Sequence, residues 1–491
     1  MTVDTKISSS PLLPFDILER IINELGHEAN QKRDYEYYCV GPARRALFEF
    51  SLVSSATLHP CRLSIFSTLS LRQTFKRDSD PDRYLEETLR MLESNPHLIP
   101  YIQQLAFPFR AVKGLAHKPG EIYNNVFPKL LTALKNLRGL VFDGLIQGGY
   151  GMETWRGVNG EVQDAMTKLI AHSNLEKLDF RWVKTLPTEM FLQLSPTIRE
   201  LRLFNIEQSS EANPTNDPTS LPRLTASPGG LRVFTMLSLG FTPPISVLQR
   251  LDFSHLTRVD TTVSVQRAED WTSLGLLLSS ARRSLESIKI YYLYRYPPPA
   301  PAIVHSFLPN LKELELIITV AIPQYNPNHP YHPMRDLAPT PQTVSYLTTH
   351  LPNAGHPSLE TIKIQLEWMA DIVEGVTPPL GQARLLLDPG LQPEWPPLDA
   401  ALSNPDSYPR LRSLEFIPLV TVYPARTERD PDLYALPTQQ EFKAEELRKQ
   451  SWYQYAQQEV REIFTRTGRR LVESGGSFVT HTPEFDAYFR T

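Results

Sequence analysis

The sequence predicts an α/β fold: a short N-terminal helical module, then an irregular solenoid with a curved parallel sheet, helices on its convex side and a C-terminal capping helix. Three observations predict it. An apolar pattern with helical spacing opens the chain, a frame of three apolar residues (Leu-x-x-Leu-x-apolar) recurs through its body, and helical stretches separate the copies of the frame. Strands that alternate with helices form parallel sheets, and each solenoid repeat needs only its neighbours to complete a core.

Composition narrows the class of protein and its partners. The 491 residues are 41% hydrophobic and 21% charged, with a net charge of −4, as in ordinary globular proteins. No basic stripe of the kind that binds nucleic acid or membrane surfaces is present, so we expect neither partner. The two cysteines are too few for a secreted disulfide scaffold, and the polar start lacks the apolar core of a signal peptide. We therefore expect a cytoplasmic or nuclear protein.

Residues 11–72 are predicted to form the helical module, after a disordered tail at 1–10. Five apolar residues with helical spacing define the first helix, Ile17, Leu18, Ile21, Ile22 and Leu25. Gly26 is predicted to end this helix, and an insert follows at 26–45. The helical pattern resumes at 46–54, and the segment 62–71 passes from a helical into an alternating, strand-like pattern.

The order of these segments resembles an F-box. Leu13-Pro14 and the first helix resemble its opening, Leu52-Val53-Ser54 its central segment, and residues 62–71 its ending in fungal members. The resemblance implies a helical bundle that docks on a Skp-type adaptor and, through it, on the cullin of a ubiquitin ligase. The adaptor contacts it implies are Leu13, Pro14, Ile17, Leu18, Ile21, Leu52 and Val53. The insert and Thr57, where tryptophan is usual, depart from the family pattern. The alternative reading of the apolar helix face is an N-terminal cap for the repeats.

Residues 73–436 are predicted to form the repeats, which resemble irregular leucine-rich repeats. Each copy of the frame ends in apolar–polar alternation, which indicates a short strand with one buried face. Steps between copies run from 23 to 52 residues, against about 20–29 in regular repeats, so we expect inserted loops. An ordinary α/β domain without a strict repeat is the alternative. The frame begins at Ile102, Leu137, Leu175, Ile198, Leu231, Leu256, Leu285, Leu311, Leu359 and Leu411.

The C-terminal part is predicted to be one long helix at 437–474, followed by a tail at 475–491. Its intermittent apolar face suits a cap over the last repeat, and a partner-binding helix is the alternative.

No catalytic motif, cofactor or metal site emerges from the sequence. His329 and His332 stand in a proline-rich stretch without further metal ligands nearby, so we expect a surface loop there. Strand residues between the buried ones are predicted to face the concave side and to bind a target, since they mix charges with aromatic rings. These candidates are Lys177, Asp179, Arg181, Arg202, Phe204, Lys289, Tyr291, Glu315, Lys363 and Gln365.

The resemblance to F-box proteins with irregular leucine-rich repeats implies a non-catalytic substrate-recognition subunit of a Skp–cullin–F-box ubiquitin ligase. Two alternatives stay open: a repeat-based interaction scaffold with a degenerate F-box, and an enzyme on an irregular α/β fold.

Overall fold

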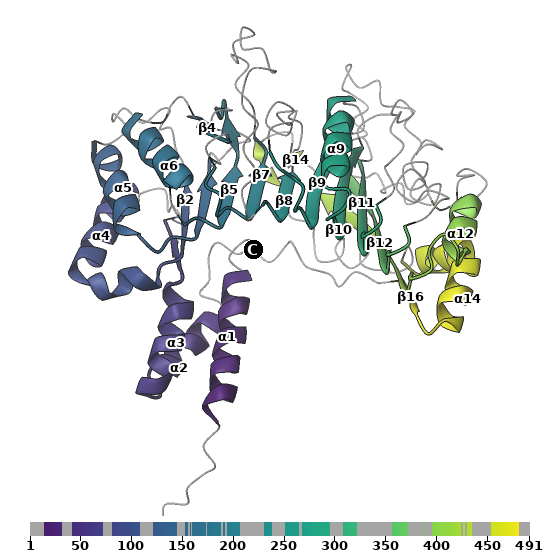
Figure 1. Ribbon diagram of the computed structural model, residues 1–491, viewed down its shortest axis with the longest axis horizontal. Helices are drawn as coiled ribbons and strands as arrows, with labels where there is room; N and C mark the ends of the chain where they lie inside the picture. Colours follow the sequence, from purple (N-terminus) through teal and green to yellow (C-terminus); the bar gives the residue numbers. More distant parts are fainter. Residues whose placement is uncertain are drawn as a thin grey trace, which may run out of the picture. The chain divides into compact units, whose positions relative to one another are not determined.

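The chain divides into two compact units, Met1–Ile198 and Arg199–Thr491. The computed structural model describes residues 14–31, 42–71, 81–108, 121–144, 153–155, 158, 160–172, 174–187, 190–191, 194–206, 230–237, 251–264, 268–294, 308–321, 356–371, 387, 395–423, 426–427, 430–434 and 453–480. Figure 1 shows their helices and strands in the colours of the chain order.

The first unit begins with three helices, α1 (Phe15–Gln31), α2 (Pro42–Ser51) and α3 (Ser55–Phe66). Their core contains Ile22, Leu47, Cys61 and Ile65, all at most 2% exposed, with Leu25, Phe50 and Phe66 packed against it. The prediction of helices in this part of the sequence is therefore confirmed.

Helix α1 does not end at Gly26, as the sequence predicted, but continues to Gln31. Gly26 is buried within the helix, and a Cβ atom there would lie 2.6 Å from Oγ and 2.9 Å from Cβ of Ser64 in α3. The glycine therefore allows close packing of two helices and does not terminate one. The predicted insert at 26–45 begins in α1 and ends in α2.

This packing predicts that the effect of Gly26→Ala on the free energy of unfolding changes sign when the Ser64 side chain is removed. Gly26→Ala should lower the free energy of unfolding by about 1–2 kcal/mol, because the added methyl group overlaps Ser64. In a Ser64→Gly background the nearest remaining atom is 3.9 Å away, and the same change should stabilise the module by about 1 kcal/mol through helix propensity. Urea unfolding of the four variants measures both effects. Equal effects of Gly26→Ala in the two backgrounds would contradict the packing role.

The turn between α2 and α3 is fixed by Ser54 and Thr57. The Ser54 hydroxyl accepts a hydrogen bond from the Thr57 N–H at 3.2 Å, which caps α3. The Thr57 hydroxyl is buried and donates to the Phe50 carbonyl at 2.8 Å. Thr57, which stands where an F-box usually has tryptophan, thus connects the end of α2 to the start of α3.

Four parallel strands follow in the first unit, in the order β1 (Thr68–Ser70), β2 (Gln104–Pro108), β3 (Gly139–Asp143) and β5 (Lys177–Arg181). The second and third apolar residues of the frame form stacked rows in this sheet, and Phe107 stacks on Phe127 with ring centroids 3.9 Å apart. The remaining elements are α4 (Pro81–Ser94), η2 (Pro96–Tyr101), α5 (Glu121–Ala133), α6 (Gly160–His172), and the paired strands β4 (Glu153–Thr154) and β6 (Val183–Lys184).

The second unit holds eight described parallel strands, which neighbour one another in chain order. They are β7 (Glu200–Phe204), β8 (Val233–Leu237), β9 (Arg258–Ser264), β10 (Ser287–Tyr294), β11 (Glu313–Ala321), β12 (Thr361–Asp371), β13 (Ser413–Tyr423) and β16 (Ser477–Thr480). Helices α9 (Ala268–Ser280), α12 (Trp395–Ser403) and α14 (Thr465–Glu473) and the antiparallel pair β14 (Arg426–Thr427) and β15 (Asp430–Tyr434) complete it. A strand occurs at every predicted copy of the frame, so the prediction of an α/β fold with parallel strands is confirmed.

The C-terminal part differs from the predicted single helix and tail. Residues 453–463 are helical, Phe464 forms a turn, and α14 follows; residues 437–452 lie outside the described part. Within the predicted tail, β16 pairs with β13. Gly475, with φ 77°, ends the helix, and Gly476 leaves room for the Ser477 N–H to reach the Arg412 carbonyl at 2.7 Å, where a Cβ atom on Gly476 would collide.

Within the described residues, none of the helices has the length and apolar content that crossing a bilayer requires.

Candidate binding surfaces

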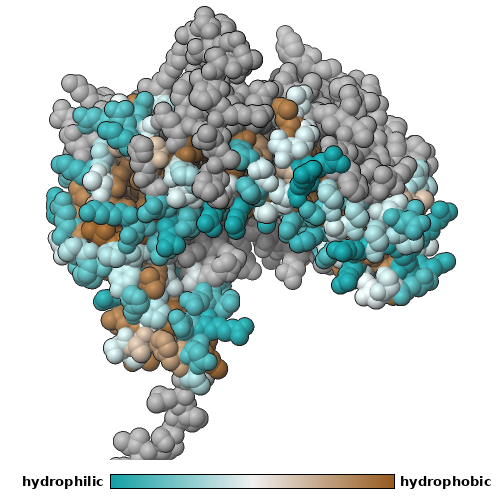
Figure 2. All heavy atoms as spheres, in the orientation of Figure 1, coloured by the Kyte–Doolittle hydropathy of each residue, from teal (hydrophilic) through white to brown (hydrophobic). Residues whose placement is uncertain are grey.

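The three-helix module carries most of the exposed large apolar side chains in the described part of the chain. Six of the ten belong to α1, α2, α3 and their turn: Phe15, Ile17, Phe48, Leu52, Val53 and Leu63. Figure 2 shows apolar residues at the surface of this module, at the lower left of the view. These exposed apolar side chains make the surface of the module a candidate interaction site.

The predicted adaptor contacts differ in their exposure. Leu52 is 86% exposed, Val53 71% and Ile17 44%. Pro14 is exposed, Leu18 and Ile21 are half-buried, and Leu13 lies outside the described residues. Sequence reasoning missed Phe15, Phe48 and Leu63. Phe48 follows the buried Leu47, so its place on the outer face of α2 is visible in the helical period.

Backbone hydrogen bonds hold the two most exposed side chains in place. The Leu52 N–H donates to the Glu49 carbonyl and the Val53 N–H to the Phe50 carbonyl, both at 3.1 Å. The Ser51 hydroxyl donates to the Phe48 carbonyl at 2.6 Å. Because the turn is ordered before any partner arrives, binding there would cost little conformational entropy.

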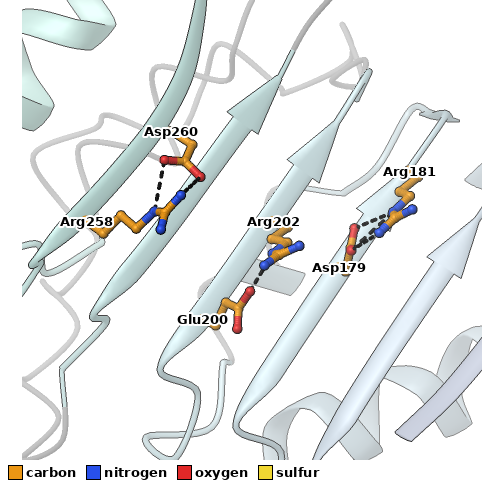
Figure 3. Close-up of polar contacts among 6 residues, drawn as sticks. All are labelled: Asp179, Arg181, Glu200, Arg202, Arg258 and Asp260. Carbon is orange, nitrogen blue, oxygen red and sulfur yellow. Dashed lines mark hydrogen bonds and ion pairs between the residues drawn. The ribbon is translucent and has the colours of Figure 1, made fainter. Parts of the chain in front are cut away.

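In each unit, the sheet face opposite the apolar rows is a further candidate surface, and it carries ion pairs within single strands. Figure 3 shows three of them, each between residues two apart on one strand, whose side chains share a face. In the first unit, Arg181 Nη2 lies 2.7 Å from Asp179 Oδ2. In the second unit, Arg202 pairs with Glu200, and Arg258 Nε lies 3.1 Å from Asp260 Oδ1.

Asp179, one of the predicted target-binding residues, is enclosed by its neighbour Arg181. Its side chain is 1% exposed and accepts three hydrogen bonds from Arg181. A carboxylate so enclosed does not present itself to a target; it holds the Arg181 guanidinium, which is 19% exposed. Lys177, Phe204 and Gln365 are half-buried.

In the second unit, ion pairs also cross between strands. Lys289 Nζ lies 3.0 Å from Glu315 Oε1, and Lys363 Nζ lies 3.9 Å from the same oxygen. Lys289 also sits over the Tyr291 ring, 5.1 Å from its centroid. Burial alone would lower the pKa of Lys289, but the hydrogen bond to Glu315 and nearby charges raise it above the usual value. Burial raises the pKa of Tyr291.

Arg258 and Asp260 are the members of this surface that sequence reasoning missed. The frame of their strand is weak, because Thr261 stands where the other copies have leucine, isoleucine, phenylalanine or methionine. Thr261 is nevertheless buried, so strict alternation would have placed Asp260 on the opposite face. The hydrogen bond that Arg258 donates to the Asp260 carboxylate raises the pKa of Arg258.

Chemistry-bearing groups are sparse elsewhere. No group of three or more His, Cys, Asp or Glu side chains among the described residues is placed to hold a metal ion; His329 and His332 lie outside that part of the chain. A hollow of about 530 Å³ runs along one polar helix face and is lined by Gln454, Gln457, Gln458, Arg461, Glu462 and Thr465.

Fold and surfaces together define an α/β protein of parallel strands that begins with a three-helix module bearing exposed apolar side chains. No protein-family model matches the chain, and no curated protein matches it.

Proposed function

We propose that the protein is the substrate-recognition subunit of a Skp–cullin–F-box ubiquitin ligase, acting in the cytoplasm or nucleus. The observation that carries the proposal is the apolar surface of the three-helix module, whose most exposed residues, Leu52 and Val53, belong to the segment that resembles the centre of an F-box. In this role the chain is a non-catalytic receptor. It holds a target near a ubiquitin-loaded enzyme and so raises the effective concentration of the target's lysines.

The adaptor contact combines the opening and the central segment of the F-box-like module. Leu52 and Val53 project from a hydrogen-bonded turn, and burying a side chain of this size contributes about 1.5–3 kcal/mol. Leu13, Pro14, Ile17, Leu18 and Ile21 form or support the same contact from the start of the chain. The charged strand faces and Tyr291 are the surface on which a target is chosen.

The test is a pulldown of the full-length chain with a purified Skp-type adaptor. Leu52→Ala/Val53→Ala should weaken adaptor binding by tenfold or more, roughly the loss of a buried side chain. Because both residues are exposed, the thermal midpoint should not change. The matched control is Val472→Ala, at an apolar position 70% exposed in the second unit, which should bind like the wild type. Unchanged binding of the double variant would remove the adaptor role of this turn.

A scaffold without a ubiquitin role is the second candidate, and Thr57 favours it. Its hydroxyl is committed to the Phe50 carbonyl, at a position where the resembled family has tryptophan. Absence of adaptor binding by the folded wild-type chain would establish this second candidate over the first.

A further inference from the structure

Five neighbouring strands of the second unit carry one row of charges that alternate in sign. The register pairs Asp260 of β9 with Lys289 of β10, Lys289 with Glu315 of β11, Glu315 with Lys363 of β12, and Lys363 with Glu415 of β13. The residues before and after each member are buried core residues, such as Ile288 and Ile290. The five charges, here called the charge row, therefore share the face opposite the core.

The charge row is partly neutralised from within. Glu315 contacts both Lys289 and Lys363, and Asp260 contacts Arg258. A partner of a single sign would meet repulsion at every second strand. The row therefore suits a partner whose own charges alternate with the same spacing, since like charges brought together at an interface are strongly disfavoured.

The distance between neighbouring strands favours one conformation of that partner. Neighbouring strands lie about 4.8 Å apart, so the row spans about 19 Å. An α-helix laid across the strands places residues i, i+3 or i+4, and i+7 about 5 Å apart along one face, which matches one residue to each of the five strands over about 15 residues. An extended chain laid the same way repeats a face only every 6.6 Å or so and loses register within two strands.

A second row of residues lies beside the charge row on the same face of the sheet. Two residues further along the strands, the register aligns Tyr291, Ile317, Gln365 and Ile417 on the same face as the charge row. Tyr291, Gln365 and Ile417 are half-buried, whereas Ile317 is buried, at 5% exposed. A helix over both rows would meet charges along one edge and mostly apolar groups along the other, so the partner helix is amphipathic.

We infer that the charge row is the docking site for an amphipathic α-helix of the target, with the charge order plus, minus, plus, minus, plus at the positions that face Asp260, Lys289, Glu315, Lys363 and Glu415. The inference rests on the proposed function, because it names the kind of segment that the receptor recognises. The binding itself needs no adaptor, which keeps the two testable apart.

The experiment uses the full-length chain and two helix-stabilised peptides of about 18 residues with the same composition and apolar stripe. One carries the alternating order, and the other carries three positive charges followed by two negative ones. Fluorescence anisotropy should show the alternating peptide binding about tenfold more tightly than the block peptide.

Two charge swaps test the site itself. Lys289→Glu/Glu315→Lys keeps an ion pair between β10 and β11 but breaks the alternation with Asp260 and Lys363, and should abolish the preference. The matched control, Glu286→Lys/Lys312→Glu, swaps a 2.9 Å ion pair that precedes the same two strands and should leave the preference intact. Thermal unfolding of both variants confirms that each is folded.

The inference is overturned when the two peptides bind equally, when neither binds, or when the two swaps have the same effect. Adaptor pulldown is measured on the same proteins. Peptide discrimination without adaptor binding removes the ligase role and leaves this inference. Adaptor binding without discrimination between the peptides supports the ligase role and overturns this inference.

Discussion

Asp399→Ala should destabilise the C-terminal end of the second unit by about 3 kcal/mol. The Asp399 carboxylate, 5% exposed in α12, accepts hydrogen bonds from the Thr467 N–H at 2.9 Å, the Arg466 N–H at 3.2 Å and the Thr467 hydroxyl at 2.7 Å. It thus caps the start of α14 from another helix, where the helix dipole favours a negative charge. The alanine removes the acceptor of the two N–H groups, whereas the Thr467 hydroxyl keeps the main-chain carbonyl of residue 399 at 3.1 Å.

The cap is reciprocal, which makes the end of the unit cooperative. Arg470 of α14 donates to the carbonyls of Leu402, Asn404 and Tyr408 at the end of α12 and just beyond it. Each of the two helices therefore satisfies the free backbone groups of the other. When α14 loosens, β16 should loosen with it, since Phe478 and Phe464 pack with ring centroids 6.2 Å apart.

Hydrogen exchange and urea unfolding check this prediction. The amides of β16 should exchange faster in Asp399→Ala, and Asp399→Asn, which keeps an acceptor but loses the charge, should be intermediate. Asp406→Ala is the control, because Asp406 lies on the surface nearby with its N–H bound to the Asn404 side chain. A β16 that exchanges at the wild-type rate in Asp399→Ala would show that the cap does not hold the strand.

Local patterns explain which parts of the fold could be predicted. The frame is readable because each strand has its own buried row and its own alternation, as Leu314-Glu315-Leu316 shows. Strand β16 was missed because its four residues, flanked by Gly475-Gly476, carry no frame. Asp399 and Thr467 are 68 residues apart, so no local pattern in the sequence predicts their contact. Gly26 was misread because a glycine inside a helix and a glycine after one look alike until the neighbouring helix is known.

The candidate surfaces were predicted to a similar extent. The exposed turn at Leu52 and Val53 came from the resemblance, whereas Phe48 required knowing which face of α2 is buried. Alternation placed Lys289 and Glu315 on the face opposite the core, but their opposite signs matter only through the register between strands. Asp179 has the same alternation as its neighbours and is nevertheless enclosed by Arg181. The exposure of a side chain on a sheet face depends on the side chains around it. The alternation of apolar and polar residues along one strand carries no information about them.

Phe142→Ala should lower the free energy of unfolding of the first unit by about 4 kcal/mol. Phe142 is the third residue of its frame and is completely buried. Its ring lies 6.0 Å from that of Phe107, 5.8 Å from that of Phe180 and 5.6 Å from that of Trp155, between centroids. Alanine removes the ring, its aromatic contacts and its buried area together, and neighbouring strands held in register cannot close the cavity.

Two substitutions separate the lost volume from other causes. Phe142→Leu keeps most of the volume and should cost less than half as much, about 1.5 kcal/mol. Val141→Ala, at the half-buried position beside it on the opposite face, should cost less than either. Urea unfolding of the three variants measures these costs. An equal cost for alanine and leucine at position 142 would show that the aromatic row is not a close-packed core, and the recurring frame would then specify strands without specifying how their third residues pack.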